Sequence, residues 1–291
     1  MRIVSLLPGA TEMVAALGAL DDLVAVSHEC DYPAAVRYLP RVTTSPIDPT
    51  ASSRGIDLAV RAAIERGEPV IGVDAAALRS AAPDVILTQS LCEVCAVDGD
   101  EVRTLADTLD KEARVLSLGG TDVQGVLADI RAVGSAIGRS PEAEHLVTDL
   151  TRRYAAISAD TSATSRSRVV CIEWLDPVFL AGHWVPELVA AAGGEDVGAR
   201  AGEHSRQVDW AHVASLQPDV MLIMPCGFDV ERTRAELAEL KDETARRLLS
   251  ETPYRILDGN AYTSRPGPRI VEAVERIREA LDEMLVTFVT R

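Results

Sequence analysis

An internal repeat constrains the fold of this chain more than any other feature, because similar segments occur in the same order in both halves. Residues 2–6 followed by 11–18 resemble residues 168–172 followed by 186–193, and residues 74–87 resemble residues 209–222. Each half predicts a short buried strand, a helix closed by glycine, an Asp-capped helix, a Pro-Asp turn and another buried strand. Two matches in the same order indicate two similar lobes.

A long amphipathic helix is predicted between the repeats, from Ser140 to Ala159. Six residues fall on one face at helical spacing: Ala143, Leu146, Val147, Leu150, Tyr154 and Ile157. At about 1.5 Å per residue the helix is a rod of roughly 30 Å. We therefore predict an α/β protein whose two similar lobes contain central parallel-type sheets. One long backbone helix joins the lobes, which gives an N-terminal lobe (1–139), a connecting helix (140–160) and a C-terminal lobe (168–291).

Composition narrows the function classes. The chain has 291 residues, 47% of them hydrophobic, and a net charge of −16. That charge argues against nucleic-acid binding, because phosphate contacts need a basic surface. No apolar run is long enough to insert in a membrane, and no secretory signal is recognised, so a cytoplasmic location is expected. Five cysteines in such a chain are not expected to form a disulfide framework.

Polar and titratable side chains follow the predicted strands of the first half. His28, Glu29, Cys30 and Tyr32 come after a strand at 23–26, where α/β folds place ligands. A second group, Cys92, Glu93 and Cys95, follows the strand at 85–88. Its Cys-x-x-Cys spacing fits half a metal site or two packed thiols better than a redox pair.

The second half supplies a matching set of candidates. Glu173, Trp174, His183 and Trp184 lie in an insertion after its first strand, where two tryptophans beside charged residues suit a pocket wall. Cys226 and Phe228 follow the strand at 220–224, and Tyr262 and Arg265 lie in a stiff loop. If the lobes face each other, these residues border one cleft. No motif indicates an activated nucleophile, a phosphate loop or a dinucleotide site, so we expect a protein that is not an enzyme.

The chain resembles the helical-backbone (class III) periplasmic binding proteins that carry cobalamin, ferric siderophores or haem, and most closely their cobalamin-binding branch. Six segments carry the resemblance, which covers essentially the whole chain: residues 5–12, 27–33, 91–97, 173–177, 182–184 and 264–269.

The resemblance implies a cobalamin-like corrinoid or related metal chelate in a shallow cleft, and an ABC importer as partner. Aromatic residues would cover the ligand, and His28 or His183 would coordinate cobalt. The expected ligand-binding residues are His28, Glu29, Tyr32, Cys92, Glu93, Glu173, Trp174, His183, Trp184, Cys226, Phe228 and Arg265. The alternative is a cytoplasmic zinc or iron–sulfur protein with a Cys/His site in the same cleft. Its metal ligands would be His28, Cys30, Cys92 and Cys95.

Overall fold

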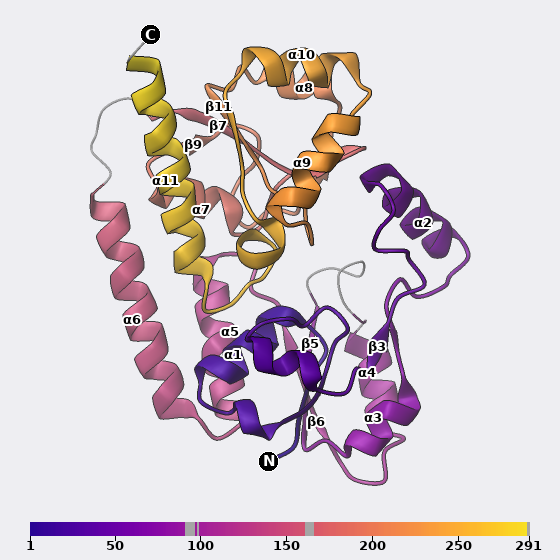
Figure 1. Ribbon diagram of the computed structural model, residues 1–291. Helices are drawn as coiled ribbons and strands as arrows, with labels where there is room; N and C mark the ends of the chain where they lie inside the picture. The colour runs from indigo at the N-terminus through magenta and orange to yellow at the C-terminus, as the bar shows by residue number, and fades with distance from the viewer. Residues whose placement is uncertain (91–96, 98, 161–165, 290–291) are drawn as a thin grey trace.

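The computed structural model describes residues 1–90, 97, 99–160 and 166–289, and it contains two α/β lobes (Figure 1). A four-stranded sheet forms the centre of the first lobe, in the order β2-β1-β5-β6, and every pairing in it is parallel. Its strands are β1 (Ile3–Ser5), β2 (Leu23–Val26), β5 (Val85–Gln89) and β6 (Arg114–Leu118). A separate antiparallel pair joins β3 (Thr43–Thr44) to β4 (Gly72–Val73).

The second lobe contains a mixed sheet, in the order β10-β8-β7-β11-β12 with β9 also paired to β7. Its strands are β7 (Arg168–Leu175), β8 (Val178–Leu180), β9 (Glu195–Asp196), β10 (Arg206–Gln207), β11 (Val220–Ile223) and β12 (Tyr254–Ile256). The parallel-type prediction holds for β9, β7, β11 and β12. It is wrong for β8 and β10, because the chain reverses at Asp176-Pro177 and returns antiparallel to β7.

Helices pack around both sheets. The first lobe has α1 (Pro8–Ala16), α2 (Ser53–Glu65), α3 (Ala75–Ala81), α4 (Gly99–Ala106), α5 (Val123–Ala136) and the 3-10 turns η1 (Leu20–Asp22) and η2 (Ala34–Tyr38). The second has α7 (Val185–Ala191), α8 (Trp210–Ser215), α9 (Val230–Glu239), α10 (Glu243–Glu251), the π-turn η3 (Gly259–Thr263) and α11 (Ile270–Val289). No helix among the described residues is both long and apolar enough to span a bilayer.

The repeated segments adopt the same structure in both lobes. β1 pairs with β5 as β7 pairs with β11, in parallel. Asp74 and Asp209 cap α3 and α8 through their side chains, as predicted. After each of these helices the Pro-Asp turn returns to the first strand of its lobe. There the Asp84 carboxylate accepts the Arg2 backbone N–H at 2.8 Å, and the Asp219 carboxylate accepts that of Arg168 at 2.8 Å.

The connecting helix α6 spans Ser140–Ala159, as the periodicity predicts. Its apolar face is buried at Ala143, Val147 and Leu150 in a core cluster that includes residues of both lobes. α6 packs against α5 of the first lobe and against α7 and α11 of the second, and it runs along one side of the molecule (Figure 1). Apolar packing therefore connects the rod to both lobes.

The lobes also approach each other through their backbones at Gly9. This residue lies in the first turn of α1, and a Cβ atom there would overlap the carbonyl oxygen of Pro266 in the second lobe. Only glycine fits this position without moving one lobe relative to the other.

We predict that Gly9→Ala lowers the free energy of unfolding by about 1–3 kcal/mol, because the methyl group forces the lobes apart. This loss would exceed the gain of about 0.5–1 kcal/mol that alanine usually gives a helix. Urea denaturation measures the change. Gly72→Ala is the control, since no heavy atom lies within 4 Å of its Cβ position. Equal stability of the two variants would contradict the close approach.

Candidate functional site

The carboxyl ends of strands from both sheets meet between the lobes. In the first lobe, β2 ends at Val26 and leads into loop 27–33. In the second lobe, β12 leads into η3, where the Asn260 amide donates to Asp31 Oδ2 at 3.3 Å. α/β folds place ligands beyond the carboxyl ends of their strands, so the candidate site lies where these loops meet.

A buried ionic cluster joins the lobes beside this loop. Glu12 of α1 accepts hydrogen bonds from Arg265 at 3.2 Å and from Arg269 at 2.5 and 2.8 Å, and its side chain is only 2% exposed. Arg265 also donates to Asp31 at 2.5 Å and to Asn260 at 2.7 Å. Burial alone would raise the pKa of Asp31, but the hydrogen bond and charge of Arg265 outweigh it, and the pKa is lowered.

This arrangement changes the role predicted for Arg265. Its side chain is 5% exposed and its guanidinium is engaged by Glu12, Asp31 and Asn260. It is therefore placed to hold loop 27–33 against the second lobe rather than to touch a ligand.

Hydrogen bonds within the first lobe orient the ring of His28. Thr43 Oγ1 donates its one hydrogen to Ser27 Oγ at 3.0 Å. Thr43 Oγ1 therefore acts as the acceptor in its two contacts with His28. It accepts the backbone N–H at 2.9 Å and the ring Nδ1–H at 2.6 Å. This pattern assigns the proton to Nδ1 and leaves a lone pair on Nε2. Burial and the charge of Arg41 lower the pKa of His28, which favours the neutral imidazole that binds metals.

The other candidates in loop 27–33 differ in environment. Glu29 is exposed as a residue, and desolvation of its carboxylate by the surrounding protein raises its pKa. Tyr32 is 49% exposed, with Arg269 4.2 Å from its ring centre. Cys30 is buried, its sulfur lies 3.1 Å from Thr11 Oγ1, and burial raises its pKa to about 11. In this structure the Cys30 sulfur is in contact with Thr11, and its role as a metal ligand stays a prediction.

The second lobe contributes an aromatic cluster, formed by Trp174, Phe228 and Arg232. The rings of Trp174 and Phe228 lie 5.1 Å apart, and the Arg232 guanidinium lies 3.6 Å from the centre of the Phe228 ring. Phe228 is 2% exposed, so it supports the half-buried Trp174 from behind. Cys226, which is partly exposed, donates its backbone N–H to Glu173 O at 2.9 Å, so the predicted residues of this wall do come together.

His183 and Trp184 do not form the predicted pocket wall. Trp184 is 5% exposed, belongs to the core, and donates its indole N–H to Thr263 O at 3.0 Å. Trp184 is the residue directly before α7, and the first residues of that helix, Val185 and Pro186, are also buried. His183 pairs instead with His204, with 3.2 Å between Nε2 and Nδ1.

Cys92, Glu93 and Cys95 lie outside the described residues. Among the residues that are described, no three His, Cys, Asp or Glu side chains gather as a metal site. Of the predicted zinc or iron–sulfur ligands, His28 and Cys30 lie among the described residues, and the metal site itself stays a prediction.

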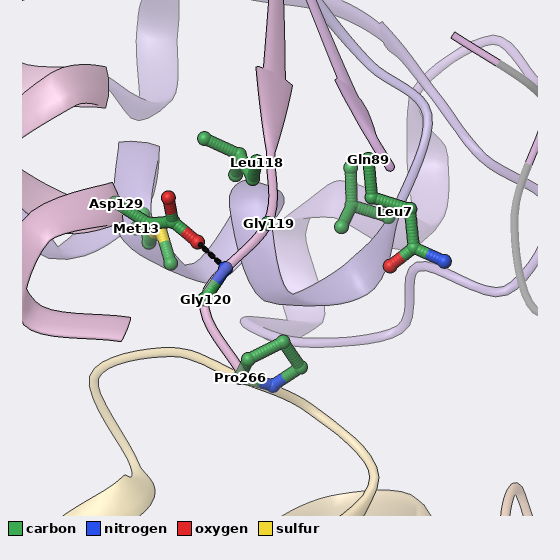
Figure 2. A pocket seen from close by; sticks show the side chains of 8 residues that line it. All are labelled: Leu7, Met13, Gln89, Leu118, Gly119, Gly120, Asp129 and Pro266. Carbon is green, nitrogen blue, oxygen red and sulfur yellow. Dashed lines mark hydrogen bonds between the residues drawn. The ribbon is translucent and has the colours of Figure 1, made fainter. Parts of the chain in front are cut away.

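A small cavity lies between the first lobe and Pro266. It measures about 10 Å³, room for one water molecule, and is too small for a chelate. Figure 2 shows Asp129 pointing toward the backbone N–H of Gly120, 2.9 Å away, beside this cavity. Burial raises the pKa of Asp129.

Sequence reasoning missed the residues that join the lobes. These include Glu12, Arg269, Ser53, Arg232 and Glu236. Their partners are far away in sequence: Arg269 and Glu12 are 257 residues apart. The one local signal was a buried helix that carries a glutamate among apolar residues at 12–17.

Comparison with known proteins agrees with this architecture. The model of the family described as "Periplasmic binding protein" matches residues 3–250. The chain belongs to this family. A search of curated proteins finds no match.

Solved structures share the binding-protein fold over nearly the whole chain. The periplasmic heme-binding protein of Roseiflexus is 19% identical, with a TM-score of 0.70 over 96% of this chain and 97% of that one. The periplasmic vitamin B12-binding protein of Vibrio cholerae is 22% identical, with a TM-score of 0.65 over 97% and 96%. A possible iron-binding protein of Staphylococcus epidermidis is 19% identical, with a TM-score of 0.69 over 96% and 98%.

We predict that Arg265→Met lowers the free energy of unfolding by about 3 kcal/mol, because it leaves the half-buried Asp31 carboxylate without its shortest hydrogen bond and removes one of the two arginines that pair with the buried Glu12. Arg152→Met is the control, since Arg152 pairs with Asp149 on the surface of α6 and should change stability by less than about 1 kcal/mol. Thermal and urea unfolding test both variants. A mild effect of Arg265→Met would contradict the proposed importance of the cluster.

The cysteines of the folded protein should differ in reactivity. Cys30 and Cys171 are buried with raised pKa values, whereas Cys226 is partly exposed. Because the thiolate is the nucleophile, iodoacetamide at pH 8 should modify Cys226 long before the other two. Peptide mass spectrometry measures the order, with urea-unfolded protein as the reference in which all three react. Fast labelling of Cys30 in the folded protein would contradict its buried position.

Proposed function

We propose that this protein is a non-catalytic binding protein for a metal tetrapyrrole, a cobalamin-like corrinoid in the first place, held between the two lobes. The observation that carries the proposal is His28, whose hydrogen bonds leave Nε2 available to a metal already held in a chelate. A chelated metal needs one or two further ligands from the protein, so a single histidine is sufficient where zinc would need three or four.

The opposite wall fits the apolar part of such a ligand. Trp174 is half-buried and is fixed from behind by Phe228, and rigid aromatic surfaces bind the faces of large planar ligands with little loss of side-chain entropy. Tyr32 and Glu29 in the histidine loop add exposed groups for contacts to polar substituents. Three residues from loop 27–33 and one from β7 thus form the proposed ligand contacts.

The similar structures support this ligand class. These proteins are described as binding heme, vitamin B12 and, as a possibility, iron, and all share the binding-protein fold. The proposal includes delivery of the ligand to an ABC importer, because the chain belongs to the periplasmic binding protein family. A cytoplasmic location stays a prediction, and the family's description points to the periplasm instead.

Titration of the purified protein with aquocobalamin and with haemin, followed by absorbance, tests the proposal. We expect saturable one-to-one binding and a spectral shift typical of imidazole ligation. His28→Ala should remove the shift and weaken binding by roughly tenfold or more, which corresponds to at least about 1.4 kcal/mol.

His145→Ala is the matched control, because His145 is an exposed histidine on α6, away from the loop. It should bind as the wild type does. If His28→Ala still binds the probes and still shows the spectral shift of the wild type, another group ligates the metal. Absence of binding by the wild type to both probes would reject the function.

A further inference from the structure

A segment of the first lobe reaches across to the second lobe on the side opposite α6. We call it the α2 arm and define it as residues 45–71, between β3 and β4, with α2 at its centre. Figure 1 shows α2 beside α9 at the edge of the second lobe, far from α6. The arm touches three elements of the second lobe: the end of β7, α9 and β10.

A carboxylate of the second lobe caps the helix of the arm. Glu236 of α9 accepts hydrogen bonds from both the backbone N–H and the hydroxyl of Ser53, each at 2.9 Å. Ser53 is the first residue of α2, so its N–H is one that the helix itself cannot satisfy. The negative charge also lies at the positive end of the helix dipole. Closure of the arm therefore gives α2 part of its N-terminal cap.

The arm also covers the aromatic cluster. The Trp174 indole N–H donates to Ser53 O at 3.2 Å, and Arg232 donates to Ala51 O at 2.9 Å. Both donors belong to the wall proposed to contact the ligand. A ligand that lies against Trp174 would therefore lie next to the arm.

These contacts to the second lobe are polar, unlike the attachment of the arm to its own lobe. Within α2 only Ser53 and Ala63 are buried, and Leu58 and Ile64 are each 56% exposed. At its base, Val60 and Ala63 pack in an apolar cluster that contains Val70 and Ile71 of the arm together with Val42, Leu78 and other residues of the first lobe. The hydrogen bonds that hold the far end are part-buried, and water can replace them once the arm moves away. Apolar packing has no such replacement, so we infer that the far end releases before the base.

The base of the arm reaches the histidine loop. Thr43 of β3, directly before the arm, is the residue that orients the ring of His28. The arm thus spans the distance between His28 on one wall and Trp174 on the other.

We propose that the α2 arm is a gate over the ligand site proposed between the lobes. It is hinged on the first lobe and fastened to the second by the hydrogen bonds of Ser53 and Ala51. The gate opens when these polar contacts break, and ligand entry requires that opening. The contacts that hold the arm against the second lobe are present in the structure whatever ligand the protein binds. The gating role rests on the proposed function.

Hydrogen–deuterium exchange of the ligand-free protein tests the fastening. Glu236→Ala should speed exchange of the α2 amides by roughly tenfold, because it removes both hydrogen bonds to Ser53. Glu236→Gln keeps one acceptor oxygen and should give an intermediate rate. Glu239→Ala is the control, since Glu239 is an exposed glutamate of the same helix. Unchanged α2 exchange in Glu236→Ala would overturn the proposal.

Stopped-flow mixing with haemin and with aquocobalamin tests the gating. Association with Glu236→Ala should be several times faster than with the wild type and with Glu239→Ala. Equal association rates, with faster α2 exchange, would overturn the gating role while the arm remains a dynamic element. If neither probe binds the wild type, the proposed function fails, and the exchange experiment still decides whether the arm is fastened as described.

Discussion

One buried carboxylate, shared by two arginines, fixes how the lobes of this protein face each other. Glu12 belongs to α1, and its partners Arg265 and Arg269 belong to the segment that precedes α11. A buried charge is stable only while its partners stay in place. Separation of the lobes here would leave the Glu12 carboxylate without its two arginines. The backbone contact of Gly9 with Pro266 lies one helical turn away and restricts rotation at the same point.

Around this cluster the two sides of the molecule are built differently. On one side α6 buries an apolar face that belongs to the core of both lobes. On the other side the α2 arm reaches the second lobe through hydrogen bonds from Ser53, Trp174 and Arg232. Apolar burial is strong and non-directional, whereas water can replace these part-buried hydrogen bonds when the arm moves away. The rod and the ionic cluster therefore form the rigid frame, and the arm is the element able to move.

The candidate site depends on that frame because its two walls come from different lobes. His28 is oriented from within the first lobe by Thr43, and Trp174 is fixed within the second by Phe228. Each side chain was expected at the site from its position after a strand. Their placement relative to each other, however, depends on Arg265, which holds the histidine loop to the second lobe. A residue first expected to touch the ligand thus acts on the site through the loop that it positions.

The sequence by itself determined the elements whose signals are local: the two repeated units, the Asp caps of α3 and α8, and the full extent of α6. Periodicity and capping act over a few residues, so they can be read without knowledge of the rest of the chain. The antiparallel β8, the burial of Trp184 and Cys30, the tautomer of His28 and the contact of Ser53 with Glu236 were decided only by the tertiary structure. In each case the deciding partner is another segment of the fold, and Glu236 is 183 residues away from Ser53. Hydrogen-bond partners and burial depend on how distant segments pack, so a pattern among neighbouring residues does not predict them.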